Sequence, residues 1–592
     1  MPAACKKLIN NVEQCVDENL EGLVAVNPGL QLLEGLRVVV RSDVGPNVVG
    51  AGKVSLLSGG GSGHEPAHAG YVGPGMLTAA VAGSVFASPP PHSILAGIKA
   101  VSAPGSAGVL LIIKNYTGDR LNFGMSAERA KSQLGVKVDM VVVGDDCALA
   151  SSDKTAGRRG LCGTLFIHKI CGALSDEGKS LEEIVRVAKD AASNMGTIGL
   201  SLTPCSIPGS GSSFQIADDE MELGLGVHGE AGVKRTKLVS AKEAVTMMID
   251  HMTNPTNSTH LPVKKGDRVA CMINNLGGTS MLELNIIAKE TIELLESRGV
   301  VVERAYCGTY ITSLEMAGIS ITLLHLDDTL RRCLDAPTSA PAWPRPLLPP
   351  GAVTRQTPSR MPRETIQTEV IKTGPTMATV GTAEANLLYD CLKLAGERLV
   401  AMESKLNELD RESGDGDCGS TMSRGAQGIL ASLGSKEKPS LPVSCPGELA
   451  LTLASAAEDT MGGSSGGLYS LFFTAAAVCL QNTVSPTTYC EALNAGIQSM
   501  MKYGGAEPGD RTMLDPLHSA WMAWSAALSS QSPVDAFRLA VEAAEKSAEE
   551  TAKMKAHAGR ASYVSADHLN NPDPGARAVA VWMRAVLEAL SS

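Results

Sequence analysis

The sequence predicts a multidomain protein, in which an α/β unit of two lobes is followed by an all-α unit. Up to about residue 335, strand-like runs rich in Val, Ile and Leu alternate with amphipathic stretches of helical period. A proline-rich segment then interrupts the pattern, and helical periodicity resumes beyond it without a clear strand signal. A chain of 592 residues is too long for one hydrophobic core, which favours at least two domains.

The N-terminal unit is predicted to span residues 9–335. Continuous apolar runs are typical of strands that are covered on both faces. Residues 180–183 and 240–243 form capping boxes that begin two helices, and a helix over 280–298 ends at Gly299. The predicted strands are residues 36–41, 53–57, 109–114, 138–143, 269–274, 300–304 and 319–326.

Residues 336–382 are predicted to be a linker. The stretch 335–382 holds nine of the chain's 31 prolines and lacks apolar periodicity, so it is expected to bury too little surface to fold. The C-terminal unit, residues 383–590, is then predicted to be all-helical. Its Ala- and Leu-rich amphipathic stretches lie at 383–409, 446–461, 467–480, 487–502, 514–528, 533–555 and 576–590.

Composition argues against several classes of function. A net charge of −11 and only 3% aromatic residues disfavour a nucleic-acid groove or a base-stacking surface. The fourteen cysteines form no C-x-x-C pair, which favours buried thiols in a reducing compartment over zinc sites. The N-terminus leads into no apolar signal core, and the apolar runs are too short to span a bilayer. A cytosolic protein without membrane contact is expected.

An acidic, glycine-rich segment is the most informative motif. Asp410, Asp415 and Asp417 lie within eight residues, and glycines flank the second and third. Crowded carboxylates repel one another unless a cation balances them, and Mg²⁺ prefers such hard oxygen ligands together with substrate phosphates. The segment therefore predicts a site for one or two Mg²⁺ ions with a nucleotide. The alternative is a solvated acidic turn, whereas an EF-hand loop does not fit the spacing.

Further glycine motifs in the C-terminal unit could complete such a site. Gly-Gly-Ser-Ser-Gly-Gly at 462–467 precedes an apolar helix, where bare backbone N–H groups can cradle an anion. Loops at 509–513 and 571–575, and Arg560, could close over the nucleotide. The alternatives are helix-packing glycines, plain inter-helix turns and a surface arginine.

The N-terminal unit places chemistry-bearing residues after predicted strands. His64 follows a run of glycines, and Lys114 and Asp119 stand at the end of another strand. His228 lies between two glycines and should be unusually accessible. Ligands of open α/β sheets bind beyond the carboxyl ends of strands, so a small ligand is expected here. The alternative for each histidine is a structural hydrogen bond.

Together these motifs resemble the dihydroxyacetone kinase family. A DhaK domain followed by a DhaL domain on one chain is similar to the ATP-dependent form, and above all to its animal branch, the triokinase/FMN cyclases. The DhaK motifs are Gly-Gly-Gly-Ser-Gly-His-Glu-Pro at 59–66, Lys-Asn-Tyr-Thr-Gly-Asp at 114–119 and Gly-Val-His-Gly-Glu at 226–230. The DhaL motifs are Asp410 with Gly-Asp-Gly-Asp at 414–417, Gly-Gly-Ser-Ser-Gly at 462–466 and Gly-Asp-Arg-Thr-Met at 509–513.

The resemblance implies a mechanism and a set of site residues. His228 would attack the carbonyl of dihydroxyacetone or D-glyceraldehyde and hold the triose as a hemiaminal, while Asp119 and His64 handle the hydroxyl proton. Gly61, Ser62, Gly63 and Lys114 would line the triose pocket. In an eight-helix DhaL barrel, Asp410, Asp415 and Asp417 would hold two Mg²⁺ on ATP. The implied nucleotide pocket consists of Cys418, Gly419, Ser420, Thr421, Ser464, Ser465, Gly504, Arg511, Thr512, Asp573, Pro574 and Gly575.

The animal branch also implies a second reaction, in which FAD is split into cyclic FMN and AMP with Mn²⁺ or Co²⁺. It implies a homodimer and a cytosolic RNA-sensing helicase as a protein partner. Cys418 departs from many relatives, which carry Thr there, so only its backbone N–H has an expected role. The linker leaves open which DhaL domain serves which DhaK domain.

Two other functions compete with this interpretation. A two-metal phosphohydrolase could use the same aspartates, but it leaves His228 and the whole N-terminal unit without a role. A non-catalytic scaffold could keep the fold for a protein partner. Because every acid and the tethering histidine are present, the sequence favours the enzyme.

Overall fold

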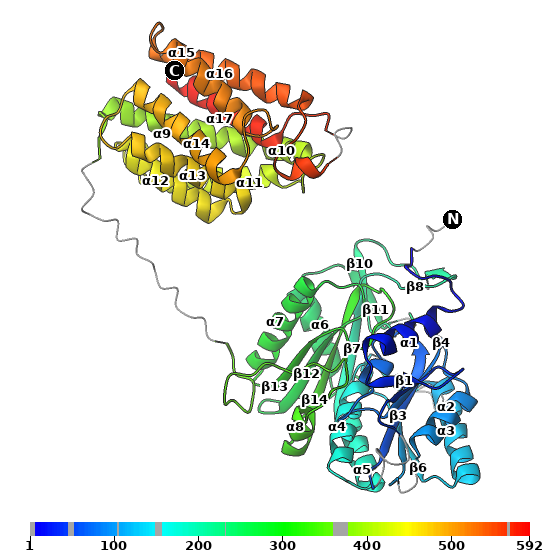
Figure 1. Ribbon diagram of the computed structural model, residues 1–592. Coiled ribbons are helices and arrows are strands. Elements are labelled where there is room, and N and C mark those ends of the chain that lie inside the picture. Colours follow the sequence, from blue (N-terminus) through cyan, green and yellow to red (C-terminus); the bar gives the residue numbers. More distant parts are fainter. Residues whose placement is uncertain are drawn as a thin grey trace. The chain divides into compact units, whose positions relative to one another are not determined.

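The computed structural model divides the chain into two compact units, Met1–Met361 and Pro362–Ser592 (Figure 1). It describes residues 6–44, 52–102, 106–148, 157–212, 214–230, 232–358, 377–564 and 569–592. Among the described helices, none combines the length and the apolar character needed to cross a membrane.

The first unit is built on two six-stranded sheets. The first sheet pairs β3 with β4 and β5, and β5 with β6, in parallel, while β2 and β1 add an antiparallel edge. In spatial order its strands are β1 (Leu30–Leu32), β2 (Val38–Arg41), β4 (Ala79–Val85), β3 (Ser55–Ser62), β5 (Val109–Lys114) and β6 (Val138–Val143). The helices α2 (Pro91–Val101) and α3 (Thr117–Arg129) cover one of its faces.

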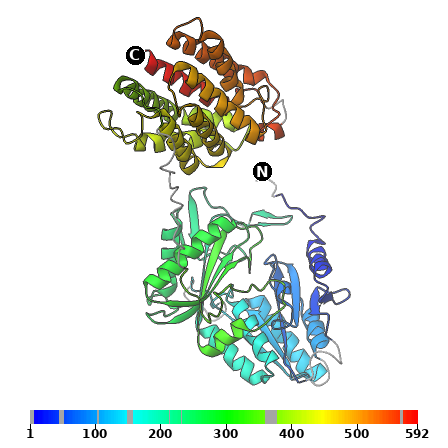
Figure 2. The ribbon, with the colours of Figure 1, turned by 60° about the vertical axis from the view of Figure 1, so that its left-hand side comes forward.

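The second sheet is mixed, with a single parallel pair between β12 and β13. Its strands in spatial order are β11 (Lys234–Lys237), β10 (Glu220–Leu223), β7 (Met195–Ser201), β14 (Gly318–His325), β12 (Arg268–Asn275) and β13 (Val301–Gly308). The helices α6 (Ala241–Thr253) and α7 (Met281–Ser297) cover its outer face (Figure 2). A two-stranded sheet, β8 (Ser206–Ile207) with β9 (Gly211–Ser212), lies apart.

The two sheets share one core, which forms around helices between them. The core contains α4 (Thr164–Asp176), α5 (Leu181–Ser193) and α1 (Cys15–Val26) together with α8 (Asp328–Asp335). Leu56 and Ile112 of the first sheet and Met272 of the second belong to the same buried cluster. This confirms the predicted α/β unit of two lobes, and the shared core fixes the strand ends of both lobes relative to each other.

Sequence patterns located the long apolar strands but missed the short ones and those rich in small residues. Strands are present within each predicted segment, whereas β1, β4, β7, β8, β9, β10 and β11 were not among the predicted segments. The strand predicted over 53–57 also extends further, because β3 continues through the glycine run to Ser62. Gly59 pairs with Ile113 on one side and Val81 on the other, so neighbouring strands hold the glycines extended.

The prediction that residues 336–382 form a linker without a core is wrong for residues 336–358. Trp343 is only 8% exposed and packs in the shared core with Tyr306 at 5.2 Å between ring centroids. Arg355 donates its backbone N–H to the carbonyl of Glu303, and buried Arg304 donates to the carbonyl of Val353 (2.7 Å). Trp343 and the edge strand β13 therefore hold residues 336–358 against the first unit, although the proline-rich composition of this stretch is typical of disorder. Residues 359–376 lie outside the described residues.

The second unit is entirely helical in the residues that the structure describes. Its helices are α9 (Thr382–Ala401), α10 (Glu403–Asp410), α11 (Cys418–Ser432), α12 (Pro446–Thr460), α13 (Gly463–Cys479), α14 (Pro486–Gly504), α15 (Leu514–Ala527), α16 (Pro533–Glu550) and α17 (Pro574–Leu590). Eight of them contact one another in the ring order α9, α11, α12, α13, α14, α15, α16, α17 and back to α9. This confirms the predicted eight-helix barrel, with α10 as a short extra helix.

Candidate functional site

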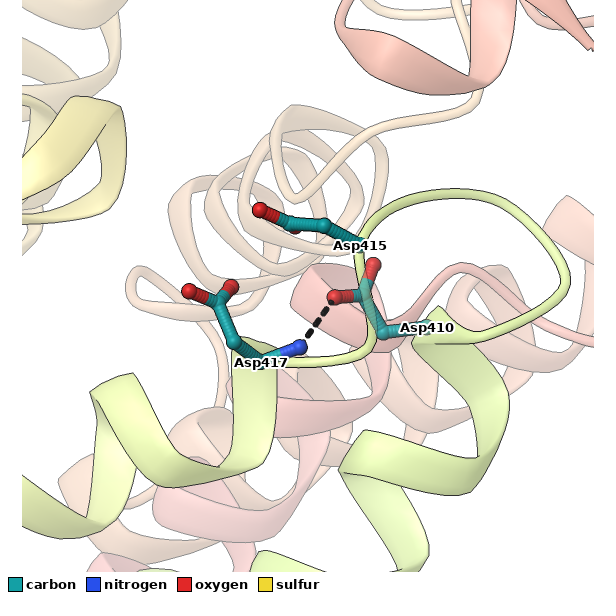
Figure 3. Close-up of side chains that lie close together, drawn as sticks. All are labelled: Asp410, Asp415 and Asp417. Carbon is teal, nitrogen blue, oxygen red and sulfur yellow. Dashed lines mark hydrogen bonds between the residues drawn. The ribbon is translucent and has the colours of Figure 1, made fainter. Parts of the chain in front are cut away.

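The aspartate loop, defined here as residues 410–418, joins α10 to α11 at one end of the barrel. Asp410 is buried and organises the loop, because its Oδ2 accepts the backbone N–H groups of Gly416 (3.0 Å), Asp417 (2.9 Å) and Cys418 (3.1 Å). Gly416 has a φ of +80°, a left-handed conformation that glycine adopts without steric cost. Figure 3 shows that the carboxylates of Asp415 and Asp417 extend to the same side of this loop.

The donor set of the loop fits a divalent cation. One oxygen from each of Asp410, Asp415 and Asp417 lies within 4.8 Å of the other two. Arg560, from the 3-10 turn η4 (Arg560–Tyr563), forms an ion pair with Asp415, and both side chains are largely exposed. Mg²⁺ takes carboxylate oxygens and keeps coordination positions for water and phosphate, so these three residues fit Mg²⁺ better than a softer metal.

A second loop offers backbone donors at the start of α13. Gly462 and Gly463 have φ values of +67° and +58°, and a Cβ on either residue would meet nothing within 4 Å. The following Ser464 and Ser465 lie in the first helical turn, whose N–H groups lack intrahelical partners. Gly504, the last residue of α14, stands beside Leu468 of the same helix α13. This edge of the barrel therefore suits an anionic ligand.

Arg511 is a buried cation of the second unit with unused hydrogen-bond donors. It is 2% exposed and has a φ of +63°, a left-handed conformation that is strained for a residue with a side chain. Its Nη2 donates to the carbonyl of Asn571 (2.8 Å), while Nε and Nη1 have no partner. A buried guanidinium with two unused donors fits a phosphate group. The next residue, Thr512, donates its backbone N–H to Asp515 (2.7 Å).

The loop before α17 joins the same end of the barrel. Asn571 donates to Glu412 of the aspartate loop (2.7 Å), and Asp573 caps α17 by accepting the N–H of Ala576 (2.8 Å). Burial, with added repulsion from Asp515 and Asp410, raises the pKa of Asp573 to about 6. Pro574 and Gly575 form the first turn of α17, and a Cβ on Gly575 would approach Met513.

Three of the predicted nucleotide residues direct their side chains elsewhere. Ser420 donates its hydroxyl to Glu403 of α10 (2.9 Å), and a Cβ on Gly419 would collide with the Glu403 carbonyl. Thr421 is buried and accepts from Arg424 (3.2 Å). At Cys418 the backbone N–H is used by Asp410, while burial and the surrounding carboxylates raise the pKa of the thiol to about 12.

In the first unit, His64 and His228 meet across the two lobes. His64 is fully buried behind β3, and its Nδ1 lies 2.8 Å from the carbonyl oxygen of Thr312. His228, between β10 and β11, places its Nδ1 2.7 Å from Glu230 and its Nε2 3.1 Å from Nε2 of His64. The structure therefore brings together two of the three predicted catalytic side chains.

Asp119 and Lys114 complete the predicted triose site from the first sheet. Lys114 ends β5 and Asp119 lies in the first turn of α3, and both side chains are buried. Burial lowers the pKa of Lys114 and raises that of Asp119, while the mutual attraction of the two opposes both shifts. Ser88 donates a short hydrogen bond to Asp119. A buried lysine and a buried carboxyl group can offer a donor and an acceptor to a sugar hydroxyl.

The glycines of the motif serve close packing against Phe86. A Cβ on Gly61 would stand 2.8 Å from the Phe86 backbone, and one on Gly63 would stand 2.8 Å from the Phe86 ring. The hydroxyl of Ser62 donates to the carbonyl of Gly83 on the β4 side (2.8 Å). Only the backbone of Gly61–Gly63 is therefore available to a triose.

Sequence reasoning missed the aromatic residues that clamp His228. The ring of Phe86 stacks on His64 (centroids 5.1 Å apart) and meets His228 edge-on (5.2 Å). Tyr116 meets the other side of His228 at 4.8 Å. Tyr116 lies inside the Lys-Asn-Tyr-Thr-Gly-Asp motif at 114–119. Phe86 belongs to no recognisable sequence motif, and its backbone has a φ of +56°. Phe86, Leu314 and Arg511 are the non-glycine residues with positive φ in the described chain, and all three lie at these two sites.

Glu230 is a second missed residue, although its signal was present two residues after His228. It accepts from the backbone N–H (3.0 Å) and from Nδ1 of His228. Burial acts to raise the pKa of Glu230, but these hydrogen bonds and the charge of His228 lower it to about 2. Gly226 leaves room for this arrangement, because a Cβ there would lie 2.0 Å from Glu230 and 2.7 Å from Arg159.

His168 of the first unit is a structural histidine, and it predicts acid sensitivity. His168 is fully buried and its pKa falls to about 3, because burial disfavours the imidazolium form. Between pH 6.5 and 3 the unfolded chain binds a proton that the folded chain does not, so this histidine lowers the free energy of unfolding by about 1.4 kcal/mol per pH unit as pH falls. We expect His168→Gln to reduce the loss of stability of the first unit between pH 7.5 and 5.5.

Differential scanning calorimetry at the two pH values measures this effect, with the transition of the second unit as an internal reference. The glutamine amide can still donate to Ser58, which lies 3.1 Å from Nε2 of His168. An identical pH dependence of wild type and His168→Gln would contradict the assignment of His168 as a buried neutral residue.

Comparisons with known proteins find a matching family domain in each of the two units of the chain. A family profile described as the Dak1 domain matches residues 21–342, and one described as the DAK2 domain matches residues 412–588. The chain is 50% identical over 594 residues to a triokinase/FMN cyclase of Mus musculus, covering 99% of both chains. It is 50% identical over 592 residues to one of Homo sapiens, covering 99% of this chain and 100% of the other.

A solved structure is similar over the same length. The dihydroxyacetone kinase of C. freundii in complex with AMP-PNP and Mg²⁺ has a TM-score of 0.65 and 35% sequence identity to the chain. The match covers 99% of this chain and 100% of that one.

Proposed function

Because the chain belongs to the dihydroxyacetone kinase family, we propose that it phosphorylates dihydroxyacetone and D-glyceraldehyde with ATP. The first unit would hold the triose and the second unit the nucleotide. The observation that carries this proposal is the orientation of His228, whose Nδ1 is committed to Glu230 so that Nε2 faces His64. A nucleophile presented in this way suits a carbonyl substrate.

The hydrogen bonds of the two histidines define a proton position. A carbonyl oxygen only accepts, so His64 carries its hydrogen on Nδ1, and the ionised Glu230 requires the same of His228. Two neutral rings would then place Nε2 lone pairs face to face at 3.1 Å, so this contact is a hydrogen bond only if the pair holds one extra proton. Burial, followed by the charge of Lys114, lowers the pKa of His64 well below its usual value, so an extra proton shared by the pair would be given up readily.

The extra proton of the histidine pair is the one that the tethering step consumes. Nε2 of His228 would bond to the carbonyl carbon of the triose while the carbonyl π bond breaks, and the proton would pass through His64 to the new alkoxide. The product is a hemiaminal on an imidazolium, whose positive charge lies against Glu230. Asp119 and Lys114 would orient the terminal hydroxyl that accepts the phosphoryl group, with Asp119 as the base. A glycerol molecule has no carbonyl and cannot be tethered.

In the second unit, Asp410, Asp415 and Asp417 would hold Mg²⁺, which neutralises and orients the phosphates of ATP. The first turn of α13 would bind phosphate through backbone N–H groups, and Arg511 through its two unused donors. These groups would orient the phosphates and neutralise their negative charge. Those are the two contributions that a loose phosphoryl transfer requires from the protein. A C. freundii relative binds AMP-PNP and Mg²⁺, which supports the same ligands here.

A coupled assay of ADP formation tests the proposed function. We expect Mg-ATP to yield ADP in proportion to added dihydroxyacetone, and glycerol to give little or none. Equal ADP formation without a triose would favour a phosphohydrolase. Absence of ADP formation from folded protein that still binds Mg-ATP would favour a scaffold.

A second candidate activity, the splitting of FAD into cyclic FMN and AMP, is supported by the names of the mouse and human relatives. FAD shares its AMP half with ATP and would enter the same nucleotide site. A ribityl hydroxyl can then attack its own nearer phosphorus, which is an intramolecular step that needs orientation and a metal. The use of Mn²⁺ or Co²⁺ in this step stays a prediction.

We also propose the remaining properties that the family resemblance implies. These are a homodimer in which units of different chains could cooperate, a cytosolic RNA-sensing helicase as partner, and a cytosolic location. The assignment of residues 9–335 to the triose and 383–590 to the nucleotide belongs with them.

Glu230→Gln is predicted to slow the kinase by lowering kcat about ten- to thousand-fold, with a smaller effect on KM for the triose. Glutamine can keep one hydrogen bond to His228 but not the charge that stabilises the imidazolium of the hemiaminal. Steady-state kinetics from pH 6 to 9 measure kcat and KM separately. Glu222→Gln is the matched control, since Glu222 pairs with Arg235 rather than with a histidine. Unchanged kcat across this pH range would contradict a positioning role for Glu230.

A further inference from the structure

A cavity of about 350 Å³ lies between α1 and the first sheet. Its walls come from Leu20 and Leu23 of α1, residues 60–62 of β3, residues 80–82 of β4 and the turn 65–70. Asn19, which is exposed on α1, also borders it, so the cavity lies next to solvent. The side chains of His64, Lys114, Asp119 and His228 do not line it, and it shares only Gly61 and Ser62 of β3 with the proposed triose site.

One buried polar atom at this cavity lacks a partner. His68 is 5% exposed, and its Nδ1 lies 3.3 Å from the hydroxyl oxygen of Ser58. Ser58 donates its own hydrogen to the carbonyl of Ile112 (2.6 Å), so it can only accept from His68, which fixes the hydrogen on Nδ1. Nε2 of His68 is therefore an acceptor without a donor. A Cβ on Gly60, another lining residue, would lie 3.5 Å from this nitrogen.

Three other polar side chains line the cavity. Asn19 is exposed, the hydroxyl of Ser62 donates to the carbonyl of Gly83 (2.8 Å), and Glu65 is an acceptor. The carboxylate of Glu65 accepts the N–H of Gly63 (2.9 Å), and burial raises its pKa. The rest of the lining is mostly alanine, leucine, proline and glycine. An anion would face two acceptors, and an ordered water would find few of the two to four polar partners that it needs. A neutral compound with an apolar body and a hydroxyl group matches these walls.

We propose that this cavity binds a small neutral hydroxyl compound of about the size of phenol, whose hydroxyl donates to Nε2 of His68. The ligand would contact Gly60–Ser62 from the side opposite to Phe86 and would stiffen the strand that leads to His64. The cavity is thus a second small-molecule site of the first unit, and it does not depend on the kinase assignment.

Ligand-observed NMR on the full chain tests this site with phenol and with anisole, which has the same ring but no hydroxyl hydrogen. We expect phenol to bind about three- to tenfold more tightly than anisole, the value of one net hydrogen bond. Saturating dihydroxyacetone should leave phenol bound. Ala82→Leu, which fills the cavity, should abolish binding, whereas Ala25→Leu on the exposed face of α1 should retain it.

Three results would each overturn the proposal: no phenol binding, equal affinity for phenol and anisole, or displacement of phenol by dihydroxyacetone. Retained binding in Ala82→Leu would do the same. If Ala82→Leu does not fold, Ala69→Leu fills the cavity from the turn instead, and the phenol and anisole comparison on the wild type needs no variant.

Discussion

Asp417→Asn is expected to lower both triose-dependent ADP formation and FAD splitting by about two to three orders of magnitude. Asp417 is an exposed member of the three-carboxylate cluster, and the loop is held by its backbone N–H rather than by its side chain. The change therefore removes a metal ligand and leaves the loop intact. Asp410 would be a poorer choice, because its Oδ2 accepts three backbone N–H groups of the loop. A substitution there would disturb the loop structure and the metal site together, and the two effects could not be separated.

Both activities should be measured over a Mg²⁺ and Mn²⁺ titration, with Asp459→Asn as the control on an exposed carboxylate of α12. A shared metal site predicts that both activities fall together and that excess Mn²⁺ restores part of each. FAD splitting at the wild-type rate with saturating Mn²⁺ would show that the two reactions use different metal ligands.

His228→Ala is expected to separate the two activities, with kinase turnover reduced at least a thousandfold and FAD splitting unchanged. The tether supplies the nucleophilic contact on which the kinase depends, whereas the FAD reaction would use only the second unit. His228 belongs to the first unit and contacts His64, Phe86, Tyr116 and Glu230 there. Its loss should therefore leave the aspartate loop untouched.

The experiment compares both turnover rates in one preparation of each variant. His92→Ala, at an exposed position at the start of α2, is the matched control for replacing a histidine of the first unit. Equal loss of both activities in His228→Ala would contradict a division of labour between the units.

Sequence patterns predicted every helix of the barrel except α11, because each predicted helix buries one apolar stripe against its neighbours, a local property with a clear period. They failed where small residues form strands, as in β4 and β7, since Ala, Gly and Ser carry no strand signal of their own. The packed stretch after residue 335 was missed for a related reason. Its composition is proline-rich, yet one buried tryptophan and two arginine contacts decide its structure.

The residues of the candidate sites also fall into those that the sequence reveals and those that it does not. The aspartates and His228 stand out in the sequence because unusual residue types are crowded between glycines. Phe86 could not be found in this way, because its role depends on a strained backbone and on two rings brought from distant parts of the chain. Ser420 illustrates the converse, since it lies inside a predicted nucleotide motif but turns its hydroxyl to α10.

A crystal structure of the protein with dihydroxyacetone is the most direct test of the central claim, that His228 holds the triose covalently. Covalent tethering predicts continuous electron density from Nε2 of His228 to a tetrahedral carbon of the triose, with Glu230 still hydrogen-bonded to Nδ1. A planar dihydroxyacetone at van der Waals distance from His228, in a crystal of active protein, would contradict it.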